Sequence, residues 1–491
     1  MLLLGIDIGT SSIKVSVTDA QTGLAITSAQ FPEDTETGII ALQPGWAEQS
    51  PDIWWQHVRQ AISKANASGK YNPKDIGAIG IAYQMHGLVL VDEQQQVLRN
   101  AIIWCDSRAV AIGEKAAKAI GEQKVLEHLL NSPGNFTAAK LAWVKENEPD
   151  IYKRIHTVML PGDFIAMKLT GQVTTSISAL SEGIFWDFKT ASLSEDVFNY
   201  FGFDKSFIPS IQPVFSEHGT ISKDVAAGLS LTPGIPVTYK AGDQPNNALS
   251  LNVLEPGEVA ATAGTSGVIY GVSDALTYDP QSRVNSFAHV NYAKDNIRTG
   301  VLLCINGTGI LNRWVKNNLS VDYPAMNKLA DMVSPGAEGL KIFPFGNGAE
   351  RMLNNKITGA QLHGIDLNLH AQAHIARAAQ EGIAFSFRYG LDIMRENGMN
   401  PTVIRAGKAN LFLSPVFAQA FVDVTNTPVE LYNCDGSVGA ATGAGIGVGV
   451  YKNAKDAFRG VKPLQLITPK ATDTYNNLYA AWKELLVKQL K

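Results

Sequence analysis

Cysteines, clustered basic residues and long hydrophobic runs are all scarce in this sequence. Three of its 491 residues are cysteines, and Cys105, Cys304 and Cys434 are too far apart for a disulfide framework or a Cys-x-x-Cys metal site. The 41 Lys and Arg against 45 Asp and Glu give a net charge of −4, without the basic cluster of a nucleic-acid or anionic-membrane binder. These absences favour a reducing compartment and a small-molecule partner, and predict no nucleic acid and no membrane.

Two weakly polar segments do not fit an export signal or a membrane span. The apolar first residues have no basic flank and reach Asp7 too soon for a signal peptide. The Gly- and Ala-rich run from Val438 to Tyr451 is shorter than the roughly 20 apolar residues of a membrane helix. We therefore expect a cytoplasmic protein.

The length and composition indicate a multidomain globular chain. At roughly 150 residues per domain, the chain forms two large domains or about three average ones. Hydrophobic residues make up 45% and charged residues 18%, which excludes a disordered or fibrous chain.

A strand–turn–strand pattern occurs twice. Residues 2–8 are apolar, Gly9-Thr10-Ser11-Ser12 forms a turn, and residues 13–17 alternate apolar and polar. Residues 258–263, the turn Gly264-Thr265-Ser266-Gly267 and residues 268–270 repeat this plan. The repeat predicts a duplicated chain. We expect further strands at 24–31, 76–83, 88–91, 101–104 and 235–239, and helices after Ser50, at 371–394, at 410–421 and at the C-terminus.

Alternating strands and helices indicate an α/β layer architecture in two halves. A strand at 235–239 runs into Gly242-Asp243, and we place the domain boundary near 235–245, between residues 240 and 241. No low-complexity linker separates the halves, so we expect them to pack together with a cleft between them.

The two Gly-Thr-Ser turns are suited to a polyphosphate, because small residues let backbone N–H groups approach phosphate oxygens. Each turn alone also fits an ordinary hairpin. A third small-residue stretch, Ser437–Gly445, lacks the lysine of a P-loop and fits a tightly packed helix equally well.

Asp7 and Asp243 each follow a buried-looking strand. A buried carboxylate needs compensation, which Mg²⁺ with its waters or hydrogen bonds from the following turn would supply to Asp7. Asp243 precedes a proline that can open a helix, so it fits an N-terminal cap or a general base for a substrate hydroxyl.

The stretch Gln84-Met85-His86-Gly87 and the loop carrying Trp104, Asp106 and Arg108 fit a sugar site. Polyols need several donors and acceptors and an apolar surface for their C–H faces. A structural histidine and a salt-bridged surface loop are the alternatives for these residues.

These motifs together resemble the FGGY carbohydrate kinases of the actin-like, ribonuclease-H-like ATPase superfamily over nearly the whole chain. The resemblance is carried by Gly5-Ile6-Asp7-Ile8-Gly9-Thr10-Ser11 with Lys14, Pro44–Gln49, Gln84–Gly87, Ala101–Arg108, Gly242-Asp243, Gly264–Gly267 and Ala376–Gly382. It implies two actin-like domains around a cleft: residues 1–240 hold the sugar and residues 241–465 the nucleotide. It also implies that the terminal helix, about 466–491, returns to the first domain, and that the protein is a possible homodimer.

The resemblance further implies an ATP- and Mg²⁺-dependent transfer of phosphate to a sugar hydroxyl. Asp243 would be the base and a metal contact, and Asp7 would face Mg²⁺ through water. The sugar side would comprise Gln84, Met85, His86, Trp104, Asp106, Arg108 and Gln244. The phosphate and nucleotide side would comprise Gly9, Thr10, Ser11, Lys14, Gly264, Thr265, Ser266, Gly309 and Gly407.

By the same resemblance, the pair Met85-His86 implies D-xylulose as the substrate, to be phosphorylated to D-xylulose 5-phosphate. The alternatives are ribulose, fuculose, rhamnulose or glycerol, a non-catalytic sugar- or nucleotide-binding regulator, and an actin-like polymerising ATPase. Three stretches depart from the family pattern: Arg405-Ala406-Gly407-Lys408-Ala409, Gly348-Ala349-Glu350-Arg351-Met352 and Ser178–Gly183.

Overall fold

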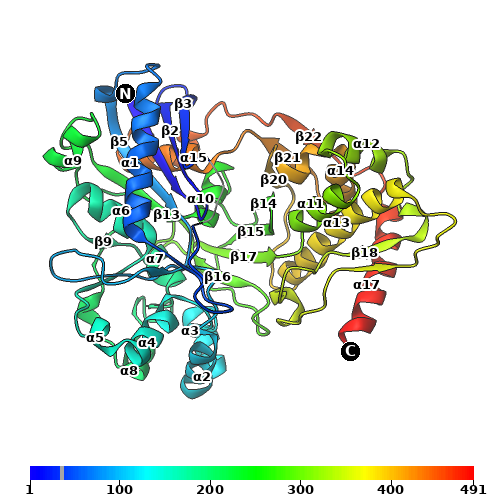
Figure 1. Cartoon of the computed structure of the whole chain (residues 1–491), viewed down its shortest axis with the longest axis horizontal. Coiled ribbons are helices and arrows are strands. Elements are labelled where there is room, and N and C mark those ends of the chain that lie inside the picture. Colours follow the sequence, from blue (N-terminus) through cyan, green and yellow to red (C-terminus); the bar gives the residue numbers. More distant parts are fainter. Residues whose placement is uncertain (34–37) are drawn as a thin grey trace.

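A computed structural model describes residues 1–33 and 38–491 and contains two mixed β-sheets, one in each half of the chain (Figure 1). The strand order of the first sheet is β13-β5-β1-β2-β3. Its strands are β1 (Leu2–Ile8), β2 (Ile13–Asp19), β3 (Ala25–Phe31), β5 (Ile76–Tyr83) and β13 (Val237–Gly242). β1 is antiparallel to β2 and parallel to β5, which is parallel to β13.

The second sheet has the order β16-β17-β15-β14-β20-β21-β22. Its strands are β14 (Val259–Ala263), β15 (Gly267–Ser273), β16 (Asn285–Ala288), β17 (Thr299–Ile305), β20 (Ile404–Gly407), β21 (Val429–Tyr432) and β22 (Gln465–Ile467). β14 forms a hairpin with β15, β17 pairs with β15, and β20 and β21 continue the sheet in parallel on the other side.

The two sheets share one core topology. β14, β15, β17, β20 and β21 are arranged as β1, β2, β3, β5 and β13 are, with the same parallel and antiparallel pairings. The predicted internal repeat is therefore confirmed. The equivalence extends to the next helices, because α10 (Asp243–Ser250) follows β13 and α15 (Gly436–Gly447) follows β21.

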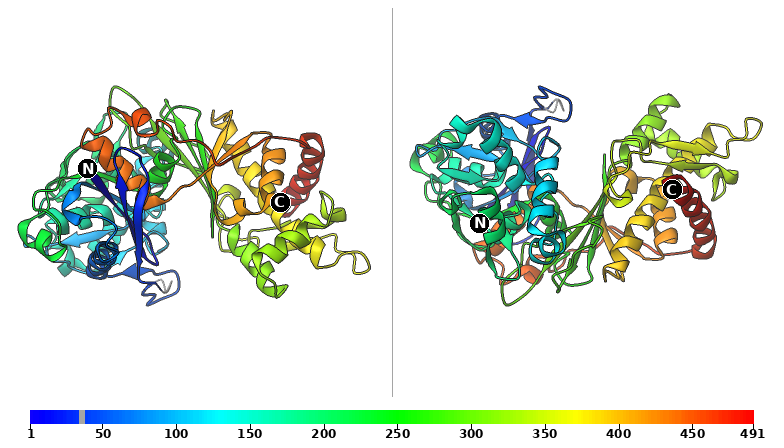
Figure 2. Two further views of the ribbon diagram at one scale, coloured as in Figure 1. Left: turned by 90° about the horizontal axis from the view of Figure 1, so that it is seen from above. Right: turned by 90° about the horizontal axis from the view of Figure 1, so that it is seen from below.

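Helix α15 leaves the second sheet and packs on the first, against β1, β2, β5 and β13 (Figure 2). Two glycines make this approach possible. A Cβ at Gly5 would lie 1.7 Å from the backbone oxygen of Ser437, and one at Gly80 would lie 1.9 Å from that of Ala440. The small residues of Ser437–Gly445 therefore serve close packing of a helix on a sheet, the alternative considered above.

The terminal helix α17 (Thr472–Leu490) packs on the second domain, so the predicted return to the first domain is wrong. Trp482 is fully buried among second-domain side chains, and its indole Nε1 donates to the Ile342 backbone oxygen at 3.0 Å. Trp482 packs against Phe385 of α13 (Gln372–Glu396), with the ring centroids 5.9 Å apart. The late segment that returns to the first domain is α15. The predicted boundary after residue 240 falls inside β13, which ends at Gly242.

The remaining elements complete the two halves of the chain. In the first half they are β4 (Glu48–Gln49), α1 (Pro51–Ala67), β6 (Val89–Val91), β7 (Ala101–Ile102), α2 (Val110–Ile120), α3 (Glu122–Leu129), α4 (Thr137–Asn147), α5 (Pro149–Tyr152), β8 (Thr157–Met159), α6 (Pro161–Thr170), β9 (Thr174–Thr175), α7 (Ile177–Glu182), β10 (Trp186–Asp187), β11 (Ser192–Leu193), α8 (Glu195–Phe201), β12 (Ser210–Ile211) and α9 (Lys223–Gly228). In the second half they are α11 (Gly309–Asn318), α12 (Tyr323–Asp331), β18 (Lys341–Phe343), β19 (Gln361–His363), α14 (Pro415–Thr425) and α16 (Ala454–Ala457).

Most predicted elements are present at shifted bounds. The helix expected at 410–421 is split, because Ser414 caps α14 and Pro415 begins it after a short 3-10 turn at Asn410–Leu413. The strand expected at 88–91 pairs with β8 and not with the preceding strand.

Separate apolar clusters fill the two domains, and a third cluster joins them. This joining cluster contains Met85 and Phe136 from the first domain together with Tyr270 and Phe287 from the second. No helix in the described ranges is long and apolar enough to span a bilayer.

Candidate active site

Asp243 lies where the two domains meet, as the first residue of α10. The strand β13 ends at Gly242, immediately before it. The Asp243 side chain is partly exposed. Burial raises the pKa of Asp243 to about 6, while hydrogen bonds from Gln244 oppose the rise. A carboxylate with a pKa near neutrality is suited to accept a proton. Gln244, predicted on the sugar side, hydrogen-bonds to this carboxylate.

Asp7 and Asp435 are acidic neighbours of Asp243. Burial and the negative charges of Asp243 and Asp435 raise the pKa of Asp7 to about 7, while Lys14 lowers it. Lys14 forms an ion pair with Asp435 at 3.6 Å, and a Cβ at Gly436 would lie 2.3 Å from Asp7 Oδ2. Three carboxylates supply the hard oxygen ligands that Mg²⁺ prefers, so these residues fit a hydrated magnesium ion.

The first Gly-Thr-Ser turn is held by a network of side chains. Trp104 Nε1 donates to Thr10 Oγ1 at 3.0 Å, and Thr10 Oγ1 lies 3.4 Å from Gln84 Oε1. Gln49 accepts from Gln84 Nε2 at 2.9 Å and donates to the Thr10 backbone oxygen at 2.7 Å. Gln84 is 3% exposed with its amide bonded to protein, so it supports the turn and does not present its amide to a ligand. Gly9 closes the turn by donating to the Ser12 oxygen, with Ser11 partly exposed at its tip.

Met85 and His86 face the joint between the domains. The His86 ring lies 4.8 Å from that of Phe136 and 5.2 Å from that of Phe287 in the second domain. Burial and the Lys140 charge lower the pKa of His86 to about 3, so the ring is neutral at physiological pH. Met85 packs on Gly242, where a Cβ would lie 2.6 Å from Met85 Cγ.

Lys140 and Glu182 hold this turn, and the sequence analysis missed both as functional residues. The buried Lys140 ammonium donates to the backbone oxygens of His86 at 2.8 Å and Ile103 at 3.0 Å. His86 Nδ1 lies 3.1 Å from the Glu182 backbone oxygen, and the Glu182 carboxyl group lies against Gly242. Burial raises the pKa of Glu182 well above its ordinary value, and the nearby Asp243 charge raises it further. A mid-helix lysine and a helix-end glutamate carry no local signal for these contacts.

Asp106 and Arg108, predicted as sugar ligands, are held in a buried ion-pair network, and their role toward a sugar stays a prediction. Asp106 is fully buried and bonds both the Arg108 guanidinium, at 2.7 Å, and the Ala47 backbone N–H. Arg108 also pairs with Glu48 at 2.7 Å and stacks on Trp46, whose ring centroid is 3.8 Å from its guanidinium carbon. This network fixes the loop that presents Trp104, which is 48% exposed.

The second Gly-Thr-Ser turn opens on a cavity of about 310 Å³. Gly309 N–H donates to the Gly264 oxygen at 3.0 Å, and the next amide, of Ile310, donates to the Thr265 oxygen at 3.1 Å. A Cβ at Gly309 would lie 2.1 Å from the Gly264 oxygen, so this close approach requires glycine. Ser266 completes the turn outside the cavity lining, which consists of Ala263, Gly264, Thr265, Gly309, Asn312, Arg313, Tyr323, Asn327, Asn410, Leu411, Leu413 and Ser414.

Gly407 is not among the residues that line this cavity, although it was predicted to contact the nucleotide. It ends β20 next to Cys434, and Asn410 lines the cavity three residues later. The Arg405 side chain of the same segment turns away to pair with Glu258 and Glu430.

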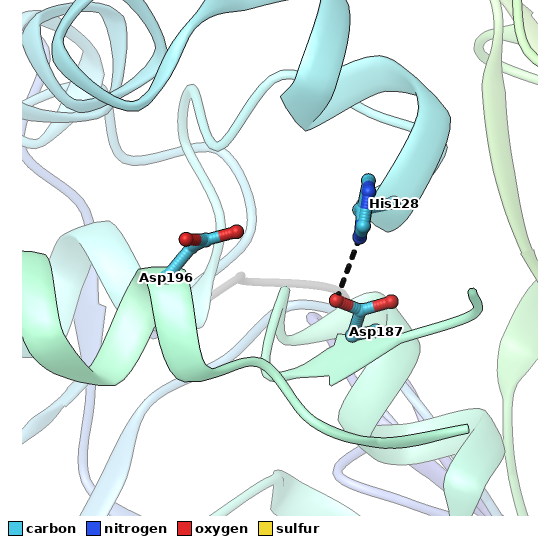
Figure 3. Close-up of side chains that lie close together, drawn as sticks. All are labelled: His128, Asp187 and Asp196. Carbon is cyan, nitrogen blue, oxygen red and sulfur yellow. Dashed lines mark hydrogen bonds and ion pairs between the residues drawn. The ribbon is translucent and has the colours of Figure 1, made fainter. Parts of the chain in front are cut away.

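A separate group of possible metal ligands lies in the first domain: His128, Asp187 and Asp196, whose ligand atoms lie within 4.8 Å of one another (Figure 3). His128 Nδ1 lies 2.8 Å from Asp187 Oδ2, and Lys124 pairs with Asp196 at 2.7 Å. Each aspartate of the group thus has a partner within the protein, so the contacts are those of an ion-pair cluster.

Asp243 and the Met85-His86 turn lie at the interface between two duplicated domains, and the cavity beside the second Gly-Thr-Ser turn lies in the second domain. Residues 2–250 match the N-terminal domain of the FGGY family of carbohydrate kinases, and residues 259–447 match the C-terminal domain of that family. The chain belongs to the FGGY family. It is a carbohydrate kinase, as the resemblance in its motifs implied, and the two-domain fold expected for this family is confirmed.

Several relatives are xylulose kinases. The chain is 28% identical to xylulose kinase of Escherichia coli, covering 90% of this chain and 88% of that enzyme. It is 29% identical to xylulose kinase of Bacillus subtilis, covering 98% of this chain and 97% of that enzyme.

Solved structures of the family share the fold along the whole chain. Xylulose kinase from Rhodospirillum rubrum superposes with a TM-score of 0.88 at 25% identity and covers 99% of both chains. Plasmodium falciparum glycerol kinase with ADP gives a TM-score of 0.89 at 21% identity, covering 100% of this chain and 98% of that chain.

Proposed function

We propose that this FGGY kinase transfers the γ-phosphoryl group of ATP to the terminal hydroxyl of D-xylulose, giving D-xylulose 5-phosphate and ADP. The observation that carries the proposal is the position of Asp243. It directly follows Gly242, which packs on Met85, and it has a pKa of about 6. The xylulose kinase relatives favour this sugar among the ketoses and polyols of the family.

In the proposed reaction Asp243 accepts the proton of the sugar hydroxyl as its oxygen attacks the phosphorus. The neutral His86 ring offers a hydrogen bond to a sugar hydroxyl, and Trp104 offers an apolar surface to the C–H face. Positioning and electrostatics account for most of the catalysis of phosphoryl transfer.

The phosphate chain would lie between the two turns. Thr10, Ser11 and Lys14 would hold it from the first domain, and Gly264, Thr265, Ser266 and Gly309 from the second. The nucleoside would occupy the 310 Å³ cavity, where Asn327 and Asn410 offer amide groups and Tyr323 offers an aromatic ring.

Asp7 and Asp243 would hold Mg²⁺ through its water shell, with Asp435 nearby. The ion would neutralise phosphate charge and orient the phosphate chain.

An ADP-release assay with Mg²⁺ and ATP across a panel of sugars tests the proposal. We expect D-xylulose to give the highest kcat/KM, above ribulose, fuculose, rhamnulose and glycerol. ATP hydrolysis without sugar should be slow, because the acceptor site excludes water. A higher kcat/KM with another polyol would replace the substrate, and calorimetric sugar binding without turnover would favour a non-catalytic regulator.

A further inference from the structure

Arg351 is an arginine without a partner at the joint between the domains. It begins a single 3-10 turn, Arg351–Leu353, and its side chain is partly buried. The structure of the described residues gives it neither a hydrogen bond nor an ion pair, whereas the buried Arg108 and Arg377 each pair with a carboxylate. A partly buried cation without an anion is unfavourable unless a ligand supplies the negative charge.

The loop that carries Arg351 is fixed to the nucleotide side of the site. The buried Glu350 carboxylate accepts hydrogen bonds from the backbone N–H groups of Asn306 and Gly307, both at 3.0 Å. The Asn306 side-chain amide donates back to the Ala349 oxygen at 2.7 Å. These bonds tie Arg351 to the turn immediately before Gly309, which lines the nucleotide cavity.

The short turn that carries Arg351 packs against β17, and the charge of Arg351 acts on groups of both domains. Its charge contributes to the lowered pKa of His86 in the first domain. Cys304 precedes the last residue of β17, and its thiol lies 3.6 Å from Asn306 Oδ1. Burial and the Glu350 charge raise the pKa of this thiol, and the charges of Arg351 and Asp243 also act on it. Cys304 also packs on the cluster that joins the domains. Arg351 therefore lies beside the end of β17 and the turn before Gly309, close enough to His86 of the first domain for its charge to act on that ring.

We propose that Arg351 is a catalytic residue whose guanidinium binds the phosphoryl group during its transfer. The inference rests on the proposed function. The bond between the γ-phosphorus and the β–γ bridging oxygen breaks, and its electron pair leaves with ADP. The sugar oxygen forms the new bond to phosphorus, and its proton goes to Asp243. The guanidinium neutralises charge on the non-bridging oxygens throughout and is unchanged at the end.

The chemistry of arginine suits this role better than that of lysine. A guanidinium donates two parallel hydrogen bonds to phosphoryl oxygens and remains charged when partly buried. Arginines that act on a transferring phosphoryl group contribute about 10³–10⁵ in kcat in other phosphoryl-transfer enzymes.

The test compares Arg351→Gln, Arg351→Lys and Arg351→Ala with the control Arg459→Gln, which alters an exposed arginine in the second half of the chain. Melting curves establish that each variant is folded. With D-xylulose, ATP and Mg²⁺, we expect Arg351→Gln to lower kcat at least 100-fold and to change both KM values less than threefold. Arg351→Lys should lower kcat at least tenfold, because lysine keeps the positive charge but cannot donate two parallel hydrogen bonds.

Added guanidinium chloride should restore part of the activity of Arg351→Ala and none of that of the control, which a purely structural arginine would not explain. A folded Arg351→Gln protein with kcat within threefold of wild type overturns the inference. So does a higher KM for the sugar at unchanged kcat, because that result makes Arg351 a sugar ligand. Wild-type protein without sugar-dependent ADP formation overturns the proposed function itself, and this inference with it.

Discussion

The two Gly-Thr-Ser turns occupy equivalent places in the two sheets, yet different parts of the chain hold them. Side chains of Gln49, Gln84 and Trp104 surround Thr10 in the first turn. Backbone N–H groups of α11 hold the second turn, and the Thr265 side chain stays exposed beside the cavity. The comparison teaches that duplication preserved the backbone plan, while the groups that surround each turn diverged.

The largest expected contrast is between Asp243 and Asp435, which lie at the starts of the equivalent helices α10 and α15. Asp243→Asn should lower kcat by about 10²–10⁴, because it removes the base while an amide occupies the same space. Asp435→Asn should lower kcat less than tenfold, because asparagine still caps α15. Steady-state ADP release measures both, and equal losses would remove the distinction between the helices.

The next contrast concerns one buried arginine in each domain. Arg108→Ala and Arg377→Ala should each destabilise the protein by about 3–5 kcal/mol, because each leaves a buried carboxylate without its partner. Thermal melting measures the losses. The KM for sugar should change less than threefold in folded Arg108→Ala protein, and a selective rise in that KM would support Arg108 as a sugar ligand.

The two threonines sharpen the contrast between the turns. Thr265→Ala should raise the KM for ATP about tenfold, the effect of losing one hydrogen bond to a charged phosphate, about 1.5 kcal/mol. Thr10→Ala should raise the KM for sugar as well as the KM for ATP, because it releases the Trp104 indole in addition to removing a phosphate contact. Initial rates with each substrate varied separately measure both, and the reverse pattern would exchange the roles of the turns.

The pH dependence of the rate tests Asp243 as the proposed base. The pKa of about 6 predicts that kcat/KM for sugar rises with pH up to about 6 and is level above it, because Asp243 acts as a base only when ionised. Initial rates between pH 5 and 8.5 measure the profile. A flat profile across this range would exclude Asp243 as the titrating base.

The smallest expected effect is on stability, and it has opposite signs for two aspartates in the first hairpin. The pKa of Asp7 is raised to about 7, so ionised Asp7 destabilises the fold as pH rises from about 4 to 7. Asp7→Asn should therefore melt a few degrees higher than wild type at pH 8, with no difference below pH 4. Backbone hydrogen bonds lower the pKa of Asp19, so Asp19→Asn should melt lower at pH 8. Melting curves at pH 8 and below pH 4 show whether Asp7→Asn raises and Asp19→Asn lowers the melting temperature.

Local patterns were enough to predict the duplicated hairpins, the two-domain α/β fold and the small-residue turns. These features are written in contiguous residues, because alternation, turn glycines and proline starts act within a few positions. The fold of each half and the place of Asp243 after β13 follow from such signals.

Contacts between distant segments could not be predicted in the same way. Asp106 and Arg108 have the composition of a sugar site, and only the fold reveals that Glu48 and Trp46 enclose them. The family resemblance assigned the terminal helix to the wrong domain, and the pattern of its aromatic face does not tell which core it packs on. Arg351 lies far from His86 in sequence, so its place beside the site depends on the packing of one domain on the other.

The crossing of α15 has a consequence for the integrity of the chain. The two family domains divide near residue 250, yet the glycine-lined face of β1 and β5 is covered by a helix that is made almost 190 residues later. A fragment ending at residue 250 would leave that face in water, so the first half can complete its own structure only after the second half has been synthesised.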